Sequence, residues 1–145
     1  DAVRIFWVNP VADLRAMNLV EELGGRIGGT DYMVLHAIDA LTEDIPPFEA
    51  LARAALADVM VGPTADCAER ICRDAVRFGA AAVVVSRIPG ASHCATEGTA
   101  IREILKDRLN LPCVEIEVGS IADAAEPALR TRLQALIETT KERQR

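Results

Sequence analysis

The chain has 145 residues, of which 50% are hydrophobic and 26% are charged, and its formal net charge is −6. This length suits one domain with a substantial core, while the acidic balance and the lack of a basic stripe argue against nucleic acid as a partner. No apolar run approaches the roughly 20 residues that cross a bilayer. Four cysteines without a C-x-x-C pair indicate the reducing cytoplasm rather than a disulfide framework.

The first predicted element is a strand over Val3 to Val8, which is apolar at nearly every residue and is therefore expected at the centre of a sheet. The sequence begins at Asp1 without an initiator methionine, shortly before this strand, so we expect a domain cut from a longer polypeptide. Asn9 and Pro10 predict the N-cap and first position of a helix that ends at Gly24. Its predicted buried stripe is Leu14, Met17, Val20 and Leu23.

The middle of the chain predicts an edge strand followed by helices. Arg26 to Thr30 is a glycine-rich strand expected at a sheet edge, and Tyr32 to Leu41 is predicted as a helix or a series of helical turns. Phe48 to Asp58 is an alanine-rich helix, and Thr64 is expected to cap a further helix that ends at Gly79. The buried stripe of this last helix is predicted as Ala68, Ile71, Cys72, Ala75 and Phe78.

The C-terminal part predicts two more strands, each followed by a helix. Ala80 to Val85 is an uninterrupted apolar run, which is typical of a strand covered on both faces, and a loop joins it to a helix that ends at Leu109. Pro112 to Gly119 alternates apolar and polar residues and therefore predicts an edge strand. Pro127 opens the last predicted helix.

The order of these elements predicts the fold class. Four strands that alternate with helices imply a parallel sheet with right-handed crossovers. Two continuous apolar strands, the first and the third, flanked by two edge-type strands favour the order 2-1-3-4. We therefore predict a single three-layer, flavodoxin-like α/β domain over residues 1–145, with ligands bound beyond the carboxyl ends of its strands.

The motifs of the usual ligands of such a sheet are absent. The first strand is followed by VNPVAD rather than by G-x-G-x-x-G, which excludes a dinucleotide fingerprint, and the sequence contains no P-loop. It also lacks a Ser/Thr/Gly cluster for a flavin phosphate, a cobalamin-type D-x-H-x-x-G and a phosphoacceptor aspartate after a central strand. The fold class alone therefore does not give the function.

Cys94 is the first residue with candidate chemistry. It lies in the loop after the third strand, at the entry to a helix, where backbone N–H groups and the helix dipole favour a thiolate. Such a thiolate suits a nucleophile or a metal ligand, whereas a small apolar residue at a helix start is the alternative, and the pattern leaves both open. A single cysteine cannot hold an iron–sulfur cluster. Of the other cysteines, we expect Cys72 and Cys113 in or near the core and Cys67 as a less favoured reactive thiol.

Four polar residues near Cys94 are candidates for substrate binding. Ser86 and Arg87 stand at the carboxyl end of the third strand, where an anion would bind, and Ser92 and His93 directly precede the cysteine in the loop. For the histidine, an ordinary loop hydrogen bond is the competing explanation.

Several segments together resemble a known family. The loop RIPGASHCATEGTAIREIL, the edge strand LPCVEIEV and the ending LRTRLQALIE from Leu129 to Glu138 are similar, in order and spacing, to the C-terminal domain of the 2-hydroxyacyl-CoA dehydratase / benzoyl-CoA reductase family. The glycine-rich segment from Gly24 to Asp31 also fits, so the resemblance covers the whole chain.

This resemblance implies a function, a cofactor and partners. The chain would be the C-terminal domain of a two-domain subunit in an iron–sulfur dehydratase, which eliminates water from a 2-hydroxyacyl-CoA after one-electron reduction. Cys94 would be one of three cysteine ligands of a [4Fe–4S] cluster, with the other two outside this chain, so we expect the fragment to bind no cofactor and to be inactive alone. The implied partners are a homologous second subunit, an ATP-dependent iron–sulfur activator protein and the acyl-CoA substrate.

Two other functions remain open at this point. One is the benzoyl-CoA reductase branch of the same family, in which an aromatic acyl-CoA is reduced. The other is a non-catalytic, flavodoxin-like interaction domain in which Cys94 is merely structural. Two further cysteines in an upstream α/β domain would favour an enzyme, and their absence would favour the interaction domain.

Overall fold

The computed structural model describes residues 2–8, 13–32, 40–58, 61–88, 90, 97–118 and 126–145. Within these residues the strands are β1 (Val3–Val8), β2 (Gly25–Asp31), β3 (Ala82–Arg87) and β4 (Cys113–Glu117). The helices are α1 (Leu14–Glu22), α3 (Pro47–Leu56), α4 (Thr64–Arg77), α5 (Glu97–Leu109) and α6 (Glu126–Arg143). None of these helices is long and apolar enough to cross a membrane.

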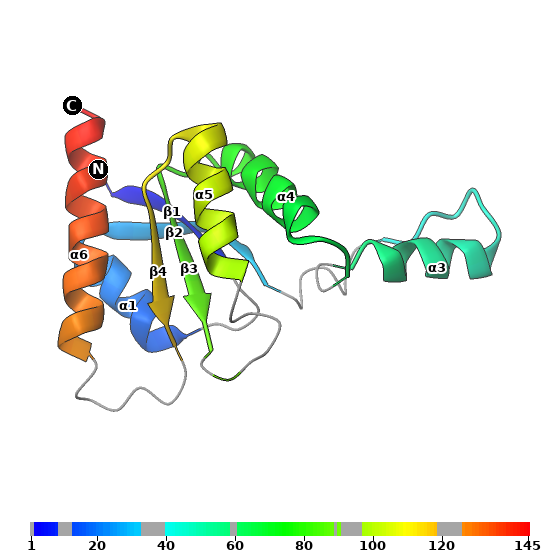
Figure 1. The fold of residues 1–145 in the computed structure, drawn as a ribbon, viewed down its shortest axis with the longest axis horizontal. Coiled ribbons are helices and arrows are strands. Elements are labelled where there is room, and N and C mark those ends of the chain that lie inside the picture. Colours follow the sequence, from blue (N-terminus) through cyan, green and yellow to red (C-terminus); the bar gives the residue numbers. More distant parts are fainter. Residues whose placement is uncertain are drawn as a thin grey trace.

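All four strands are parallel, and their order in the sheet is β2-β1-β3-β4 (Figure 1). This order confirms the predicted flavodoxin-like arrangement 2-1-3-4. The two continuous apolar strands occupy the centre because both of their faces are covered, whereas the glycine-rich β2 and the alternating β4 form the edges. The carboxyl ends of all four strands therefore lie along the same edge of the sheet.

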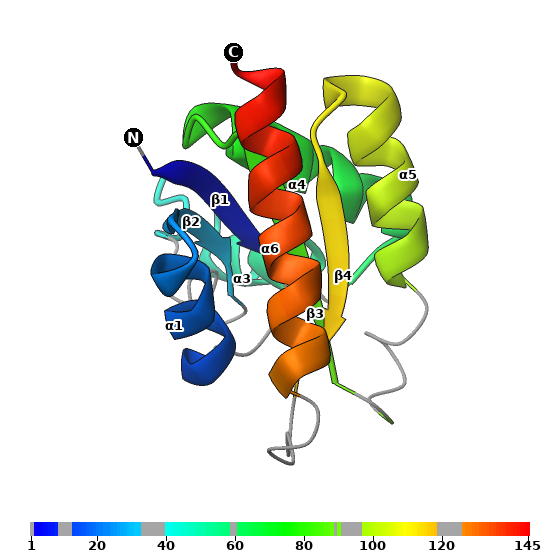
Figure 2. The same cartoon turned by 90° about the vertical axis from the view of Figure 1, so that its left-hand side faces the viewer.

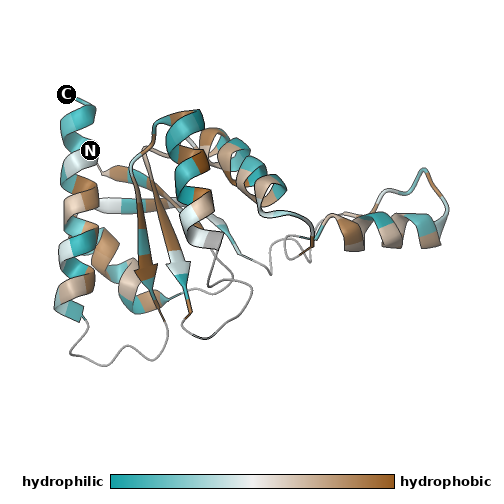
Figure 3. Cartoon of the chain, viewed as in Figure 1, coloured by the Kyte–Doolittle hydropathy of each residue, from teal (hydrophilic) through white to brown (hydrophobic). Residues whose placement is uncertain are grey.

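Helices cover both faces of this sheet and form a three-layer α/β domain. Helices α1 and α6 pack on one face, and α4 and α5 pack on the other (Figure 2). Side chains of β1 alternate between the two cores, with Trp7 facing α1 and α6 and Phe6 facing α4 and α5. Figure 3 shows hydrophobic residues along β3 and β4, between these helical layers.

Helix α1 begins later than the sequence predicts. Its N-cap is Asp13, whose Oδ1 accepts a hydrogen bond of 3.0 Å from the backbone N–H of Ala16. This carboxylate satisfies one of the free N–H groups of the first turn, so the prediction of Asn9 as the cap is wrong. Asn9 and Pro10 themselves lie outside the described residues. The predicted end is confirmed, because Gly24 follows the helix with a φ of 90°, a conformation that glycine adopts without strain.

The buried face of α1 also differs from the predicted stripe. Leu14 is 71% exposed, whereas Val20 is buried as predicted. Met17 and Leu23 are partly buried and pack against the same core, so of the predicted stripe only Leu14 is wrong. Ala16 and Leu19 are further buried positions of this helix that the prediction did not include.

Three other predicted boundaries need correction or lie outside the described residues. Strand β3 includes Ser86 and Arg87, because its pairing with β4 continues through both residues. Thr64 is the first residue of α4 rather than its cap, which is Pro63. The helical segment predicted from Tyr32 to Leu41 falls mostly on residues 33–39, which lie outside the described residues.

Helix α3 extends away from the sheet (Figure 1). Its apolar side chains Phe48, Leu51 and Leu56 are exposed, and Ala50 is its one buried residue. The predicted alanine-rich helix is thus confirmed, but its apolar stripe is not covered by the described part of the chain.

Candidate functional site

The carboxyl edge of the sheet is the place where a parallel α/β fold binds its ligands. Strands β1 to β4 end there at Val8, Asp31, Arg87 and Glu117. The described side chains at this edge form two groups, one around Arg87 and one around Asp31.

Ser86 is closed off from solvent and joins the two central strands. It is 1% exposed, and its Oγ accepts a hydrogen bond of 3.2 Å from Trp7 Nε1. The same hydroxyl donates to the carbonyl oxygen of Val8, also at 3.2 Å. The hydroxyl is therefore fully engaged in this conformation, and the predicted contact between Ser86 and a substrate stays a prediction.

Arg87 is held by two carboxylates of the neighbouring strand. Its Nε lies 3.3 Å from Glu115 Oε1, and its Nη2 donates to Glu117 Oε1. An anionic substrate group at Arg87 would have to compete with these two carboxylates. The predicted anion-binding role of Arg87 accordingly depends on a rearrangement of these ion pairs.

Gly98 brings the start of α5 against the same carboxylate. A Cβ atom at Gly98 would lie 2.8 Å from Glu115 Cδ and 3.0 Å from each of its two carboxylate oxygens. A side chain at position 98 would displace this carboxylate, whereas glycine leaves room for it, so Glu115 lies against both Arg87 at the end of β3 and the first turn of α5. The two ends of the loop between β3 and α5 therefore both lie beside Glu115 at the carboxyl edge.

The predicted loop residues Ser92, His93 and Cys94 lie outside the described residues. Their roles stay predictions. The structure fixes the described residues on either side of the loop, through the contacts of Glu115 with Arg87 and Gly98. The sequence contains the glycine at the start of the helix and the glutamates of the alternating strand. Composition alone does not show that these residues contact one another.

The second group at the edge joins β2 to α4 through residues 39 positions apart, and no local pattern in the sequence predicts their contact. Arg70 Nη2 lies 3.4 Å from Asp31 Oδ2 and 3.4 Å from Cys67 Sγ. Asp31 is buried, and Arg70 Nε is also buried, without a hydrogen-bond partner among the described residues. This group places Cys67 beside a positive charge, although its predicted alternative role as a reactive thiol stays untested.

Cys72 and Cys113 lie in or beside the core, as predicted. Cys72 is buried on the inner face of α4, and Cys113 packs against the same hydrophobic cluster from the start of β4. Burial raises the pKa of the Cys113 thiol to about 12, and it also raises the pKa of Cys72. The apolar surroundings of both sulfurs therefore disfavour the thiolate form.

The described residues do not by themselves fit an iron–sulfur cluster. Within them, no group of three or more His, Cys, Asp or Glu residues could hold a metal ion. Cys113 begins β4 at the amino end of the strand, opposite the carboxyl edge. A cluster at the carboxyl edge would therefore need donors other than Cys72 and Cys113.

The buried thiol of Cys113 predicts a loss of stability at alkaline pH. An unfolded cysteine ionises near pH 8.5, whereas the folded thiol has a pKa of about 12. Between these values the folded state binds one more proton than the unfolded state. The free energy of unfolding should therefore fall as pH rises, by about 1.4 kcal/mol per pH unit.

Urea unfolding at pH 8.0 and 10.5, followed by far-UV circular dichroism, measures this slope. Because other groups also titrate, Cys113→Ala serves as the control and should show a shallower fall. Equal slopes for the two proteins would contradict the prediction.

A protein-family model matches most of this chain. The family model for 2-hydroxyglutaryl-CoA dehydratase, D-component, matches residues 1–140. The comparison with curated proteins finds no matching sequence. The family match includes the loop, the edge strand and the C-terminal helix that carry the sequence resemblance.

Proposed function

This chain belongs to the 2-hydroxyglutaryl-CoA dehydratase D-component family, and from this membership we propose that it is the C-terminal domain of a dehydratase subunit. The complete enzyme would eliminate water from a 2-hydroxyacyl-CoA after one-electron reduction. The single observation that carries this proposal is the family match over residues 1–140. The cytoplasm is the proposed location.

The proposed contribution of this chain is one thiolate ligand, Cys94, for a [4Fe–4S] cluster. The cluster would bind and reduce the substrate in the complete enzyme. Support for this position comes from the two ends of the loop, since Arg87 and Gly98 both contact Glu115 at the carboxyl edge. The family resemblance implies that the other two cluster ligands come from residues outside this chain. The packing of Cys72 and Cys113 in or beside the core is consistent with this proposal.

The proposed substrate contacts come from the same loop and strand end. Ser92 and His93 would face the acyl-CoA, and Arg87 would bind an anionic group of it after releasing a carboxylate. Ser86 would act indirectly, by holding β3 against β1 through Trp7 and Val8. A homologous second subunit and an ATP-dependent iron–sulfur activator protein are the proposed partners.

The test is anaerobic purification of the complete subunit with its partner subunit, followed by iron and sulfide analysis and visible absorption spectroscopy. We expect Cys94→Ala to lose most of the cluster absorption of this subunit. Cys113→Ala is the matched control, because it also removes one thiol from this chain and should retain the cluster.

The product assay separates the remaining alternatives. Conversion of a 2-hydroxyacyl-CoA to the enoyl-CoA in the presence of the activator and ATP supports the proposal. Reduction of benzoyl-CoA instead would assign the protein to the reductase branch. Unchanged cluster content in Cys94→Ala would refute the ligand assignment, and an absence of iron in the complete complex would favour a non-catalytic interaction domain.

A further inference from the structure

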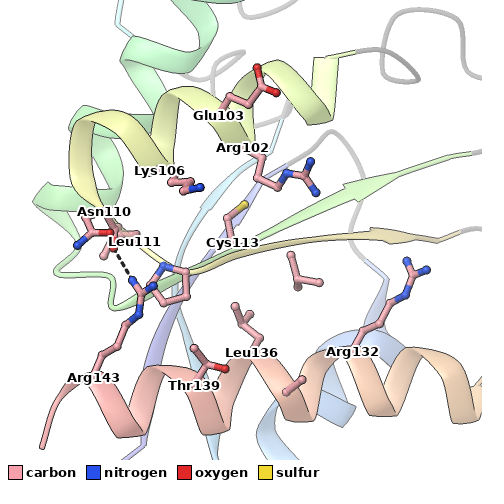
Figure 4. Close-up of a pocket in the computed structure, with 13 residues that line it drawn as sticks. Arg102, Glu103, Lys106, Asn110, Leu111, Cys113, Arg132, Leu136, Thr139 and Arg143 are labelled. Atoms are coloured by element: carbon pink, nitrogen blue, oxygen red, sulfur yellow. Dashed lines mark hydrogen bonds between the residues drawn. The ribbon is translucent and has the colours of Figure 1, made fainter.

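The edge strand β4 forms the floor of a groove that the proposed dehydratase function does not use. The groove has a volume of about 610 Å³ and lies between α5 and α6 (Figure 4). Arg102 and Lys106 come from the α5 wall, Arg132 and Arg143 come from the α6 wall, and Cys113 and Val114 form part of the floor. A groove of this size and mixed polarity is large enough to hold a ligand or a peptide.

The backbone of β4 presents hydrogen-bonding groups along its outer edge, which begins in this groove. The carbonyl of Pro112 accepts from Val83 N at 2.9 Å, and Val118 N donates to the carbonyl of Arg87 at 2.8 Å. The N–H and C=O of one strand residue point to the same side, and successive residues alternate. The backbone groups of the odd-numbered residues 113, 115 and 117 therefore point away from β3, toward the open edge.

One of these outward groups already has a side-chain donor. Arg132 Nη1 lies 3.4 Å from the carbonyl oxygen of Glu115. Because this hydrogen bond is long, a backbone N–H of an added strand would replace Arg132 as the donor to the Glu115 carbonyl. The outer backbone groups of β4 are therefore positioned to pair with another strand.

The walls of this groove are predominantly positive, although the whole chain carries a formal net charge of −6. Toward the carboxyl end of β4 the edge also carries Glu115 and Glu117, and both of these carboxylates are paired with Arg87. Four cations line the groove, and Glu103 is the one acid among its lining residues. In the part of the chain that the structure describes, Arg102, Lys106, Arg132 and Arg143 form no ion pair with a carboxylate. The groove is therefore complementary to an acidic ligand.

The cations are spread along the groove rather than gathered at one point (Figure 4). Arg132 and Arg143 are separated along α6 by about 16 Å, at a rise of about 1.5 Å per residue. About five residues of an extended strand cover the same length. A linear ligand with several negative charges fits this spacing better than a single phosphate does.

A second copy of this chain is a poor occupant. Pairing two β4 edges about a two-fold axis would bring the cationic walls of both copies together, and like charges at such short range are unfavourable. The exposed backbone edge, the length of the groove and its charge together favour a heterologous polypeptide.

We propose that the open edge of β4, between α5 and α6, accepts an extended acidic segment of a partner protein as a fifth strand. Main-chain hydrogen bonds to residues 113, 115 and 117 would supply affinity, and the four cations would select carboxylate side chains. The proposal uses neither Cys94 nor the proposed substrate contacts, so it does not depend on the proposed dehydratase function.

The probe is a fluorescein-labelled peptide of seven residues that alternates glutamate and valine, and fluorescence anisotropy measures its binding to the 145-residue chain. We expect saturable binding that weakens with added salt, and no binding of the matching lysine–valine peptide. The double variant Arg102→Glu/Arg143→Glu should weaken binding at least tenfold. The control Arg26→Glu/Lys141→Glu makes the same charge change on exposed residues outside the groove and should leave binding within twofold.

Backbone methylation distinguishes strand addition from simple charge attraction. One peptide carries N-methyl groups on its odd-numbered residues and another on its even-numbered residues, and we expect only one of the two to lose binding. Equal binding of both, with inorganic tripolyphosphate displacing them, would overturn the proposal in favour of a general anion groove. Failure of the unmodified peptide to bind would also overturn it, and the cations would then serve to protect an exposed edge strand.

Discussion

Replacing Trp7 with alanine should lower the free energy of unfolding by about 3–5 kcal/mol, the cost of removing a large aromatic side chain from a packed core. Trp7 is fully buried near the carboxyl end of the central strand β1 and contacts the core formed with α1 and α6. Its indole also donates to Ser86 Oγ, which in turn donates to the carbonyl oxygen of Val8. The substitution therefore creates a cavity and also leaves the Ser86 hydroxyl without its donor.

Urea unfolding followed by far-UV circular dichroism measures this loss, because Trp7 is the only tryptophan of the chain and its fluorescence disappears in the variant. Ser86→Ala is the matched control for the hydrogen bond. It keeps the indole but leaves its N–H unpaired, so we expect a smaller loss of about 1–3 kcal/mol. A loss below about 1 kcal/mol for Trp7→Ala would show that this core does not hold the central strands together.

The strand order follows from the sequence for a simple physical reason. In the centre of a parallel sheet, helices cover both faces, so a central strand must be apolar at nearly every position. Val3 to Val8 and Val83 to Val85 meet this requirement, whereas β2 contains three glycines and β4 carries Glu115 and Glu117. Composition thus separates central from edge strands before any contact is known.

The start of α1 could not be predicted in the same way. Asn9 followed by Pro10 and Asp13 followed by Leu14 are both acceptable helix starts, because each offers a side-chain oxygen to the first turn. The choice depends on where the chain leaves β1 and meets α6, which is a tertiary effect. The predicted stripe was right for Met17, Val20 and Leu23, which contact the core, whereas Leu14, the first residue of the helix, is exposed.

The environment of the candidate site depended on contacts between distant residues. Ser86 and Arg87 were correctly placed at the carboxyl end of the third strand, but their partners lie on neighbouring strands. The pairing of Arg87 with Glu117 follows from the register between β3 and β4, and no local pattern contains that register. Asp31 and Arg70 are likewise separated by 39 positions.

The second large effect should come from Asp31, which forms a mostly buried ion pair. The side chain of Arg70 is 17% exposed and that of Asp31 is 6% exposed, and the two lie 3.4 Å apart. Asp31→Ala would leave the guanidinium without this carboxylate in a site that water reaches poorly. Because an unpaired buried charge is costly, we expect the free energy of unfolding to fall by about 2–4 kcal/mol.

A double-mutant cycle with Arg70→Met measures the coupling between the two residues. Removing both charges should cost less than the sum of the single variants, because neither partner is then left uncompensated. Glu69→Ala is the control on the same helix, since it breaks the exposed ion pair with Arg108, and it should change stability by less than about 1 kcal/mol. Additive effects of Asp31→Ala and Arg70→Met would mean that the two charges do not stabilise one another, and the link between β2 and α4 would then rest on apolar packing alone.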